Sequence, residues 1–301
     1  MGRQIQHICV CICTFKRPHI LRSLLQELAE QETQGLFSLS IIVVDNDHLQ
    51  SAKALVIEFA TRSSVPVSYC LEPKQNIALA RNKAVDNCAG DFVAFIDDDE
   101  LPIPSWLVTL FKACHEYRAD GILGPVKPVF DDKAPDWIIK SGLYNRRNYH
   151  TGLVIDGRKG RTGNVLLKKE VFNVHEQWFR PEFRDGEDQD FFTRMIERGH
   201  KFVWCAEAVA YEIVPPIRWS RSFLLKRALL RGTNALTQSN SNAMSITKSI
   251  IAVPIYVAAL PFTLMLGQHR LMTCLVKLCN HLGKLMALVG INLIKEPYVT
   301  E

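Results

Sequence analysis

The first 130 residues alternate short apolar runs with helical patterns, and this alternation limits the possible folds more than any other feature. The apolar runs predict strands at residues 8–13, 39–44, 67–71 and 91–96. Helical periodicity predicts helices at residues 19–31, 52–61 and 77–87, and another that follows Pro104 and runs to Tyr117. Alternating strands and helices form a mostly parallel sheet with helices on both faces, so the sequence predicts an α/β domain.

Four carboxylates, Asp97, Asp98, Asp99 and Glu100, directly follow the predicted strand at 91–96. Carboxylates this close repel one another unless a cation or solvent compensates, and open α/β sheets bind ligands beyond the carboxyl ends of their strands. Mg²⁺ and Mn²⁺ prefer such oxygen ligands and are commonly shared with substrate phosphates. The cluster predicts a metal and phosphate site; the alternative is a solvated loop.

Further candidate ligand-binding residues follow the other predicted strands. They are Thr14, Phe15 and Arg17 after the first strand, Asp45 after the second, and Asn76 and Arg81 after the third. The Arg81 guanidinium could reach a base or a phosphate, although a solvated helix residue fits the same pattern. Gathered at one edge of the sheet, these residues predict a nucleotide site.

Basic residues are concentrated in the C-terminal part of the chain. The net charge is +5, but residues 213–301 hold ten Lys and Arg against two Glu, a net charge of +8. A basic segment is typical of nucleic-acid or anionic-membrane binding. The apolar content of this segment favours the membrane over nucleic acid.

Two stretches within this basic segment predict membrane-associated helices. Residues 249–266 are an uncharged run of 18 residues, just long enough to span a hydrocarbon core, but two prolines interrupt it. A re-entrant or interface-lying pair of half helices fits this pattern at least as well as a single span. Residues 271–294 carry a polar stripe at helical spacing, typical of a helix in a membrane interface: Lys277, His281 and Lys284. The alternatives are a hydrophobic core pair or a dimer interface, and whether 249–266 spans the membrane stays open.

The cysteines indicate a reducing compartment. The chain has 9 cysteines, an odd number, and no apolar leader run near its first residue, which favours the cytoplasm. Cys9, Cys11 and Cys13 alternate with apolar residues, so their thiols share one strand face about 6.6–7 Å apart. That spacing suits small buried hydrophobes better than one zinc ion with Zn–S bonds of about 2.3 Å.

Five segments, in this order, carry a resemblance to a known family. They are Cys-Thr-Phe-Lys-Arg-Pro (13–18), Val-Val-Asp-Asn-Asp (43–47), Asn-Ile-Ala-Leu-Ala-Arg-Asn (76–82), Gly-Asp-Phe-Val-Ala-Phe-Ile-Asp-Asp-Asp-Glu (90–100) and Gly-Glu-Asp-Gln-Asp-Phe-Phe (186–192). The chain resembles glycosyltransferase family 2 over roughly residues 8–235, and looks most like the bacterial exopolysaccharide glucosyltransferases of the succinoglycan type.

This resemblance implies a GT-A fold, which is a mostly parallel mixed sheet flanked by helices, together with a UDP-sugar donor and Mg²⁺ or Mn²⁺. The expected domains are a GT-A domain at 1–240 and a C-terminal membrane-associated helical segment at 241–301. Within the first, residues 1–120 would bind the nucleotide and 121–240 the acceptor.

The resemblance also assigns roles to individual residues. Those expected to bind the nucleotide-sugar are Thr14, Phe15, Arg17, Asp45, Asn76, Arg81, Asp97 and Asp98. Those expected to hold the metal are Asp99, Asp97 and Glu212, the last in place of a His that many relatives carry. Asp188, or its neighbour Glu187, matches the general base, which implies inversion at the anomeric carbon; helix-end charge complementarity is the alternative.

Two further features bear on the acceptor. Arg218-Trp219 lacks the upstream Gln of processive relatives, which predicts transfer of a single sugar. Candidates for contacting a diphosphate or the acceptor are Asn164, Lys226, Arg227 and Arg231; the three basic residues equally suit anionic lipid.

The expected protein is therefore an inverting hexosyltransferase at the cytoplasmic face of the inner membrane, acting on a lipid-linked saccharide in surface polysaccharide assembly. A catalytically silent membrane-bound sugar-nucleotide binder or scaffold is the alternative. A nucleotidyltransferase and a dinucleotide-dependent oxidoreductase fit less well, because no Gly-rich phosphate loop follows the first predicted strand.

Overall fold

The computed structural model describes residues 5–174, 176–183, 186–237 and 243–291, to which all structural statements below refer. They form two compact units, which are described separately. Unit 1 holds the chain up to Lys127 together with Arg146–Ile213. Unit 2 holds Pro128–Asn145 and the chain from Val214 onward.

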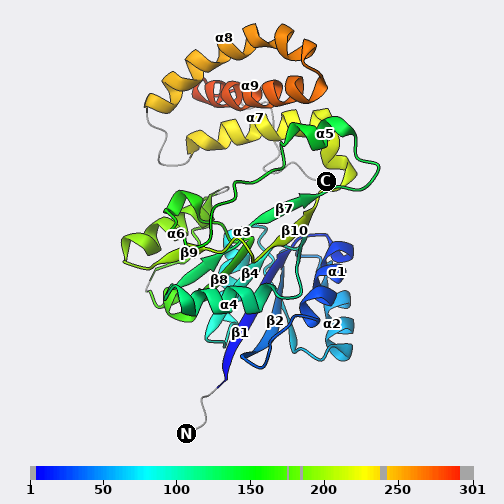
Figure 1. Ribbon diagram of the computed structural model, residues 1–301, viewed down its shortest axis with the longest axis vertical. Helices are drawn as coiled ribbons and strands as arrows, with labels where there is room; N and C mark the ends of the chain where they lie inside the picture. Colours follow the sequence, from blue (N-terminus) through cyan, green and yellow to red (C-terminus); the bar gives the residue numbers. More distant parts are fainter. Residues whose placement is uncertain (1–4, 175, 184–185, 238–242, 292–301) are drawn as a thin grey trace. The chain divides into compact units, whose positions relative to one another are not determined.

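Unit 1 is built on a seven-stranded mixed sheet (Figure 1). In spatial order its strands are β3 (Val67–Leu71), β2 (Phe37–Asp45), β1 (Gln6–Thr14), β4 (Phe92–Ile96), β8 (Asn164–Lys168), β6 (Gly121–Leu123) and β9 (Phe202–Trp204). The first four pair in parallel, and β8 runs antiparallel to β4 and β6. The mostly parallel sheet and its first four strands are confirmed.

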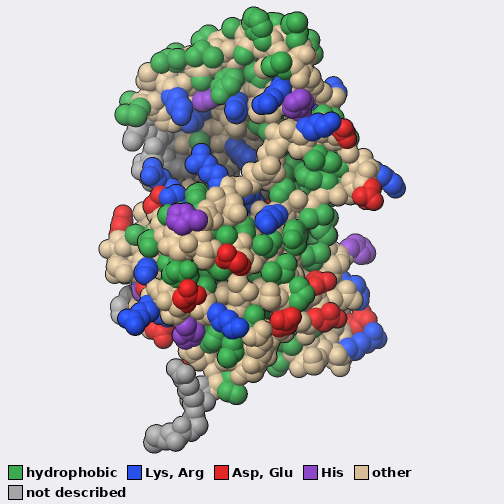
Figure 2. Space-filling model, in the orientation of Figure 1, with side chains coloured by type: hydrophobic (Ala, Val, Ile, Leu, Met, Phe, Trp, Pro, Cys, Tyr) green, Lys and Arg blue, Asp and Glu red, His purple; other side chains and the backbone are tan. Residues whose placement is uncertain are grey.

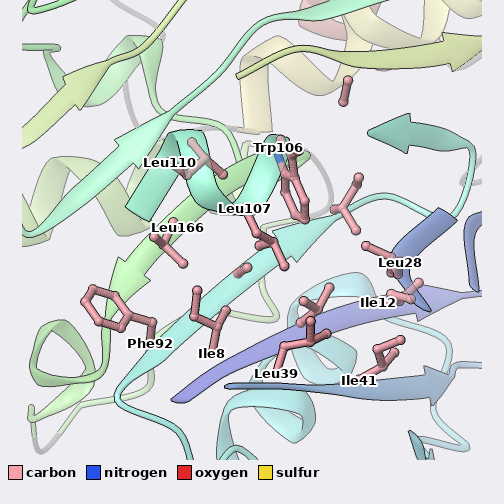
Figure 3. Packing of buried hydrophobic residues seen from close by; sticks show 14 of the residues in the cluster. Ile8, Ile12, Leu28, Leu39, Ile41, Phe92, Trp106, Leu107, Leu110 and Leu166 are labelled. Carbon is pink, nitrogen blue, oxygen red and sulfur yellow. The ribbon is translucent and has the colours of Figure 1, made fainter. Parts of the chain in front are cut away.

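Helices cover both faces of this sheet. They are α1 (Pro18–Ala29), α2 (Lys53–Arg62), α3 (Ile77–Asp86), α4 (Trp106–Glu116) and α6 (Glu187–Glu197). Side chains of α1, α2 and α4 join a core cluster on one face, partly drawn in Figure 3, and those of α3 and α6 join a second cluster. Short 3-10 helices occur at Gly157–Lys159 and Lys169–Phe172.

Strand β1 shows why the sequence folds this way. Ile8 and Ile12 belong to the first core cluster, as Figure 3 shows, whereas Cys9 and Cys11 belong to the second. Both thiols are free and buried, and burial raises the pKa of Cys11 well above its usual value. Cys9 and Cys11 are therefore buried among apolar side chains as predicted, whereas Cys13 is only partly buried against the same cluster.

A second, three-stranded sheet has the order β5 (Glu100–Pro102), β10 (Ala210–Ile213) and β7 (Val126–Val129). β10 runs antiparallel to β5, with Glu212 opposite Glu100. This pairing joins the strand after the acidic segment to a strand more than a hundred residues later in the chain.

Unit 2 is helical. Its helices are α5 (Asp136–Ser141), a 3-10 turn (Pro216–Trp219), α7 (Arg221–Thr237), α8 (Ala243–Met265) and α9 (Gln268–Leu288). α7 and α9 touch at two glycines: a Cβ on Gly232 would lie 2.2 Å from the Asn280 carbonyl oxygen, and one on Gly283 would lie 2.2 Å from that of Leu229. Because α7 packs on α9, it falls in unit 2, which differs from the domain boundary expected at residue 240.

Helices α8 and α9 are both long and apolar enough to cross a membrane by length and composition. α8 is one curved helix through Pro254 and Pro261, not the expected pair of half helices (Figure 1). Residues 292–294 of the helix expected at 271–294 lie outside the described residues.

Two of the three residues in the polar stripe on α9 contact α8, and the third, Lys277, is exposed. His281 Nδ1 lies 3.0 Å from the Ser249 hydroxyl, and Lys284 donates to the Ser245 hydroxyl at 2.8 Å. These two side chains therefore point toward α8 and form hydrogen bonds with its serine hydroxyls.

Candidate active site

The carboxyl ends of β1, β2 and β4 meet at one edge of the parallel sheet. Thr14 is the last residue of β1 and lies opposite Asp45, the last residue of β2, while Asp97 follows β4. The structure thus brings together three of the strand ends from which the sequence predicted a nucleotide site.

The acidic segment is tied to the end of β1. Thr14 donates its hydroxyl hydrogen to Asp98 at 2.7 Å, and Arg17 lies 3.3 Å from both Asp98 and Asp99. Burial and the neighbouring Asp99 raise the pKa of Asp98 to about 7, against the lowering effects of Arg17 and Thr14. The protein surroundings therefore disfavour the ionised form of Asp98, which a bound cation would stabilise.

The loop after β1 has an unusual backbone. Lys16 has a φ of 58°, in the left-handed region, and its ammonium lies 5.0 Å from the centre of the half-buried Phe15 ring. Strain of this kind concentrates at ligand-binding loops. The expected nucleotide residues Phe15 and Arg17 flank this strained position.

Arg81 on α3 links the acidic segment to helix α6. Its buried guanidinium bonds the Glu187 carboxylate and lies 3.7 Å from Asp97. Burial alone would lower the pKa of Arg81, but Glu187, Asp97 and Asp188 outweigh it and raise the pKa further. Arg81 is therefore a buried ion-pair residue and not the solvated helix residue of the alternative.

Asparagines hold the loops around Arg81, and two of them were not predicted as site residues. Asn46 donates to the carbonyls of Glu72 and Lys74 at 2.9 and 2.8 Å. Asn82 donates to the carbonyl of Phe179 at 2.7 Å and accepts from its N–H at 2.9 Å. Both lie within the segments that carry the family resemblance, which was the available signal.

Asn76 and Asp45 were expected to bind the nucleotide, but the structure uses their side chains within the protein. Asn76 caps α3 by accepting from two backbone N–H groups, and donates to the Pro181 carbonyl at 2.9 Å. Asp45 is fully buried and accepts from the N–H groups of Asp47 and Ala52 and from the Tyr69 hydroxyl. Both residues shape loops at the sheet edge.

Glu187 and Asp188 open helix α6 after Gly186, whose φ of 84° suits glycine. Glu187 is buried against Arg81, whereas Asp188 is partly exposed and accepts the Gln189 N–H at 2.7 Å. Burial and Glu187 raise the pKa of Asp188 to about 6, with Arg81 acting in the opposite direction. A carboxylate with this pKa is suited to accept a proton near neutral pH.

Sequence reasoning missed a second charge cluster, which is centred on Arg146 and includes Glu100 of the acidic segment. Arg146 is 3.3 Å from Glu100 and 2.6 Å from Glu212. Burial and Asp97 raise the pKa of Glu100, although Arg146 lowers it. Glu212, an expected metal ligand, is thus paired with a cation of the protein itself.

Asn164, a candidate acceptor contact, is bonded within the core. It is 2% exposed, accepts from the Trp106 indole N–H at 2.8 Å, and donates to the carbonyls of Pro125 and Ala208. Its neighbour Gly163 leaves room for the carboxylates, because a Cβ there would lie 2.8 Å from Glu100 and 3.0 Å from Asp97.

The remaining candidates are on α7 in unit 2, whereas the acidic segment is in unit 1. They are Lys226, Arg227 and Arg231. Arg227 lies over the Phe223 ring, 6.0 Å from its centre, and Lys226 is exposed.

The acidic segment has the chemistry that a divalent cation requires. Among the described residues, no group of three or more His, Cys, Asp or Glu side chains is arranged to hold a metal. Mg²⁺ is usually held by one or two carboxylates together with substrate phosphates, so such a cage is not required. Two carboxylates of this segment fit that pattern: the side chain of Asp97 is 40% exposed and that of Asp99 is 12% exposed.

Comparisons with known proteins give the family. The sequence profile described as Glycosyl transferase family 2 matches residues 9–174. The Succinoglycan biosynthesis protein ExoM of Rhizobium meliloti (strain 1021) is 30% identical over 98% of this chain and 97% of its own.

Solved structures give the same fold. The mannosyltransferase PcManGT from Pyrobaculum calidifontis, in complex with GDP-Man and Mn²⁺, matches with a TM-score of 0.61 and 16% identity over 95% of this chain and 88% of its own. Residues 1–349 of S. aureus TarS with UDP-GlcNAc match with a TM-score of 0.53 and 17% identity over 82% and 70% of the two chains. The chain is a glycosyltransferase of the GT-A fold and belongs to glycosyltransferase family 2.

Proposed function

We propose that this glycosyltransferase transfers a single hexose from a UDP-sugar to a lipid-linked saccharide, with inversion, during surface or exopolysaccharide assembly. The ExoM relative is named for succinoglycan biosynthesis, and the TarS structure was determined with UDP-GlcNAc, which support the pathway and the donor. The basic, apolar C-terminal segment supports a lipid-linked acceptor, reached from the cytoplasmic face of the inner membrane.

One observation carries the proposal: Arg81 joins the helix that begins with Glu187 and Asp188 to the acidic segment at Asp97. This ion pair holds a proton acceptor at a fixed place relative to the strand ends where the donor would bind. Holding a base in the right geometry beside the reacting bond lowers the barrier, because the entropy of positioning is lost before the reaction begins.

In the proposed reaction, Asp188 takes the proton of an acceptor hydroxyl as its oxygen attacks the anomeric carbon. The carbon–oxygen bond to UDP breaks with its electron pair going to the diphosphate, and attack from the opposite face inverts the configuration. Thr14, Phe15, Arg17, Arg81 and Asp98 would surround the nucleotide and diphosphate.

Asp97 and Asp99 would hold Mg²⁺ or Mn²⁺. When bound, the cation would stabilise the charge that develops on the leaving diphosphate. We assign Asp45 and Asn76 to shaping the nucleotide loops, because their side-chain atoms are bonded within the protein. The candidates for binding the diphosphate of a lipid carrier are Lys226, Arg227 and Arg231.

The test is UDP release from a panel of UDP-sugars, by membrane-bound enzyme supplied with lipid extract and either Mg²⁺ or Mn²⁺. We expect metal-dependent release with one donor, and a loss of about 10²–10³-fold in Asp99→Ala, because a group that stabilises transition-state charge is removed. Asp132→Ala, an exposed aspartate in unit 2, should release UDP normally. UDP-sugar binding without release from any donor, lipid extract included, would instead favour the silent binder.

The rate should also depend on pH through Asp188. Because the pKa of this acid is raised to about 6, the basic form predominates above pH 6 and is lost below it. We expect kcat/KM to fall about tenfold for each pH unit below 6. A profile with no acid limb between pH 5 and 7, at constant metal occupancy, would contradict this assignment.

A further inference from the structure

The outward face of α8 is an apolar surface. Ile250, Ile251 and Ile255 are 58%, 57% and 59% exposed, and Phe262 and Met265 are 69% and 86% exposed. Figure 2 shows hydrophobic side chains gathered over α8, and Lys, Arg and His side chains over the helices beneath it. An apolar surface of this kind marks a contact with a membrane or another protein.

The opposite side of α8 is covered by α9 and carries Ser245, Ser249 and Tyr256 among smaller apolar residues. Ser249 is fully buried there beside His281, and Ser245 bonds Lys284. Tyr256 stacks on the His281 ring with 5.7 Å between ring centres. One face of α8 is therefore covered by contacts with α9 within unit 2, and the other face is exposed.

The packing of α9 argues against a membrane-spanning hairpin. α9 lies between α8 and α7 (Figure 1), and its glycine contact with α7 leaves no space for lipid between them. If α8 and α9 crossed the bilayer as a hairpin in this fold, α7 would enter the bilayer with them, because it packs on α9. α7 carries four basic residues, Arg221, Lys226, Arg227 and Arg231. Each cation near the bilayer centre opposes insertion by about 2.5–3.5 kcal/mol.

We propose that α8 lies in the plane of an anionic membrane, with its apolar face in one leaflet and no segment of α8 or α9 crossing. α8 has 23 residues and is about 35 Å long, which would suffice to span a bilayer. The packing of α9 against α7, and not the length of α8, therefore decides whether α8 spans the membrane or lies in its plane. This proposal rests on the membrane attachment in the proposed function and specifies how that attachment is made.

Charge identifies the lipid class. Residues 213–295 contain Lys and Arg but no Asp or Glu, and exposed Lys248 and Arg270 lie on α8 and at the start of α9. A basic surface around an apolar helix face matches anionic headgroups around an acyl interior.

The first experiment is flotation of the full-length protein with vesicles of phosphatidylcholine, with and without phosphatidylglycerol. Ile251→Asp with Ile255→Asp should weaken binding to the anionic vesicles about 100-fold, because two apolar side chains no longer enter the acyl region. Ile57→Asp, at a position on α2 that is 51% exposed, should bind as wild type. Lys248→Gln should weaken binding about fivefold, and only to anionic vesicles.

The second experiment tests the topology. In intact spheroplasts, Arg270→Cys at the turn between α8 and α9 should react with a membrane-impermeant maleimide only after lysis, like the control Ile57→Cys, with wild-type labelling subtracted. A hairpin that crosses would expose residue 270 outside, so labelling in intact cells would overturn the proposal.

Two other results would also overturn it. If the wild-type protein failed to float with anionic vesicles, anionic lipid would be excluded as its partner. UDP release with a soluble acceptor would still test the transferase activity separately. If the double aspartate variant lost self-association and the wild type never floated, the α8 face would be an interface between two copies of the chain.

Discussion

Replacing Asp188 by Asn is expected to lower kcat about 10²–10⁴-fold, the contribution typical of a positioned general base. The change is isosteric, and the Asn oxygen can still accept the Gln189 N–H that Asp188 accepts at 2.7 Å. Helix α6 should therefore keep its position, and the Kd for the UDP-sugar should change little. Single-turnover product formation together with donor binding by calorimetry separates these two quantities.

Asp190→Asn is the matched control, because it removes a carboxylate from the same helical turn. Asp190 pairs with Arg194 at 2.8 Å and with Arg180 at 3.4 Å. Losing this carboxylate should therefore lower the free energy of unfolding, while the kcat of the folded enzyme should change less. If Asp188→Asn retained more than a tenth of the wild-type kcat, the base would have to be sought elsewhere. Equal losses in both variants would point to helix-end charge and not to proton transfer.

Replacing Arg146 by Met is expected to lower the free energy of unfolding by about 3 kcal/mol. Glu100 is fully buried and Glu212 is 6% exposed, and replacing Arg146 removes the cation that lies 3.3 Å from Glu100 and 2.6 Å from Glu212. Breaking a buried ion pair by removing one partner typically costs 3–5 kcal/mol, and the 30% exposure of the Arg146 side chain places the effect at the low end. Urea unfolding followed by circular dichroism measures it.

The neighbouring Arg147→Met is the control, since Arg147 is exposed and loses the same charge and a similar side-chain volume. Adding Glu100→Gln to Arg146→Met should restore part of the lost stability, because the uncompensated charge is removed with its partner. Equal unfolding free energies for the two Arg variants would show that the Glu100–Arg146–Glu212 cluster contributes nothing measurable.

Local sequence patterns predicted much of the first half of unit 1. Continuous apolar runs such as that of β1 are buried on both faces, so their strand character did not depend on distant partners. The acidic residues that follow β4 were predicted as a ligand site for the same reason, since a parallel strand fixes the edge at which its end lies.

Long-range contacts account for what was missed. Arg146 reaches Glu100 and Glu212 from a segment with no periodicity or motif of its own. Asn164 and Asp45 matched ligand-binding positions, but the structure satisfies their oxygens with backbone and side-chain donors. Whether a polar side chain is left to bind a ligand or is used within the fold depends on which hydrogen-bond donors of the protein surround it.

The sequence by itself determined the α/β class, the sheet edge that carries the acids, and the apolar, basic character of the C-terminal helices. Periodicity and charge are properties of neighbouring residues, and they act on a segment wherever it finally packs. The tertiary structure alone decided that Arg81 ties Glu187 to Asp97 and that His281 and Lys284 turn toward α8. Those contacts join residues far apart in the chain, and only packing brings them within bonding distance.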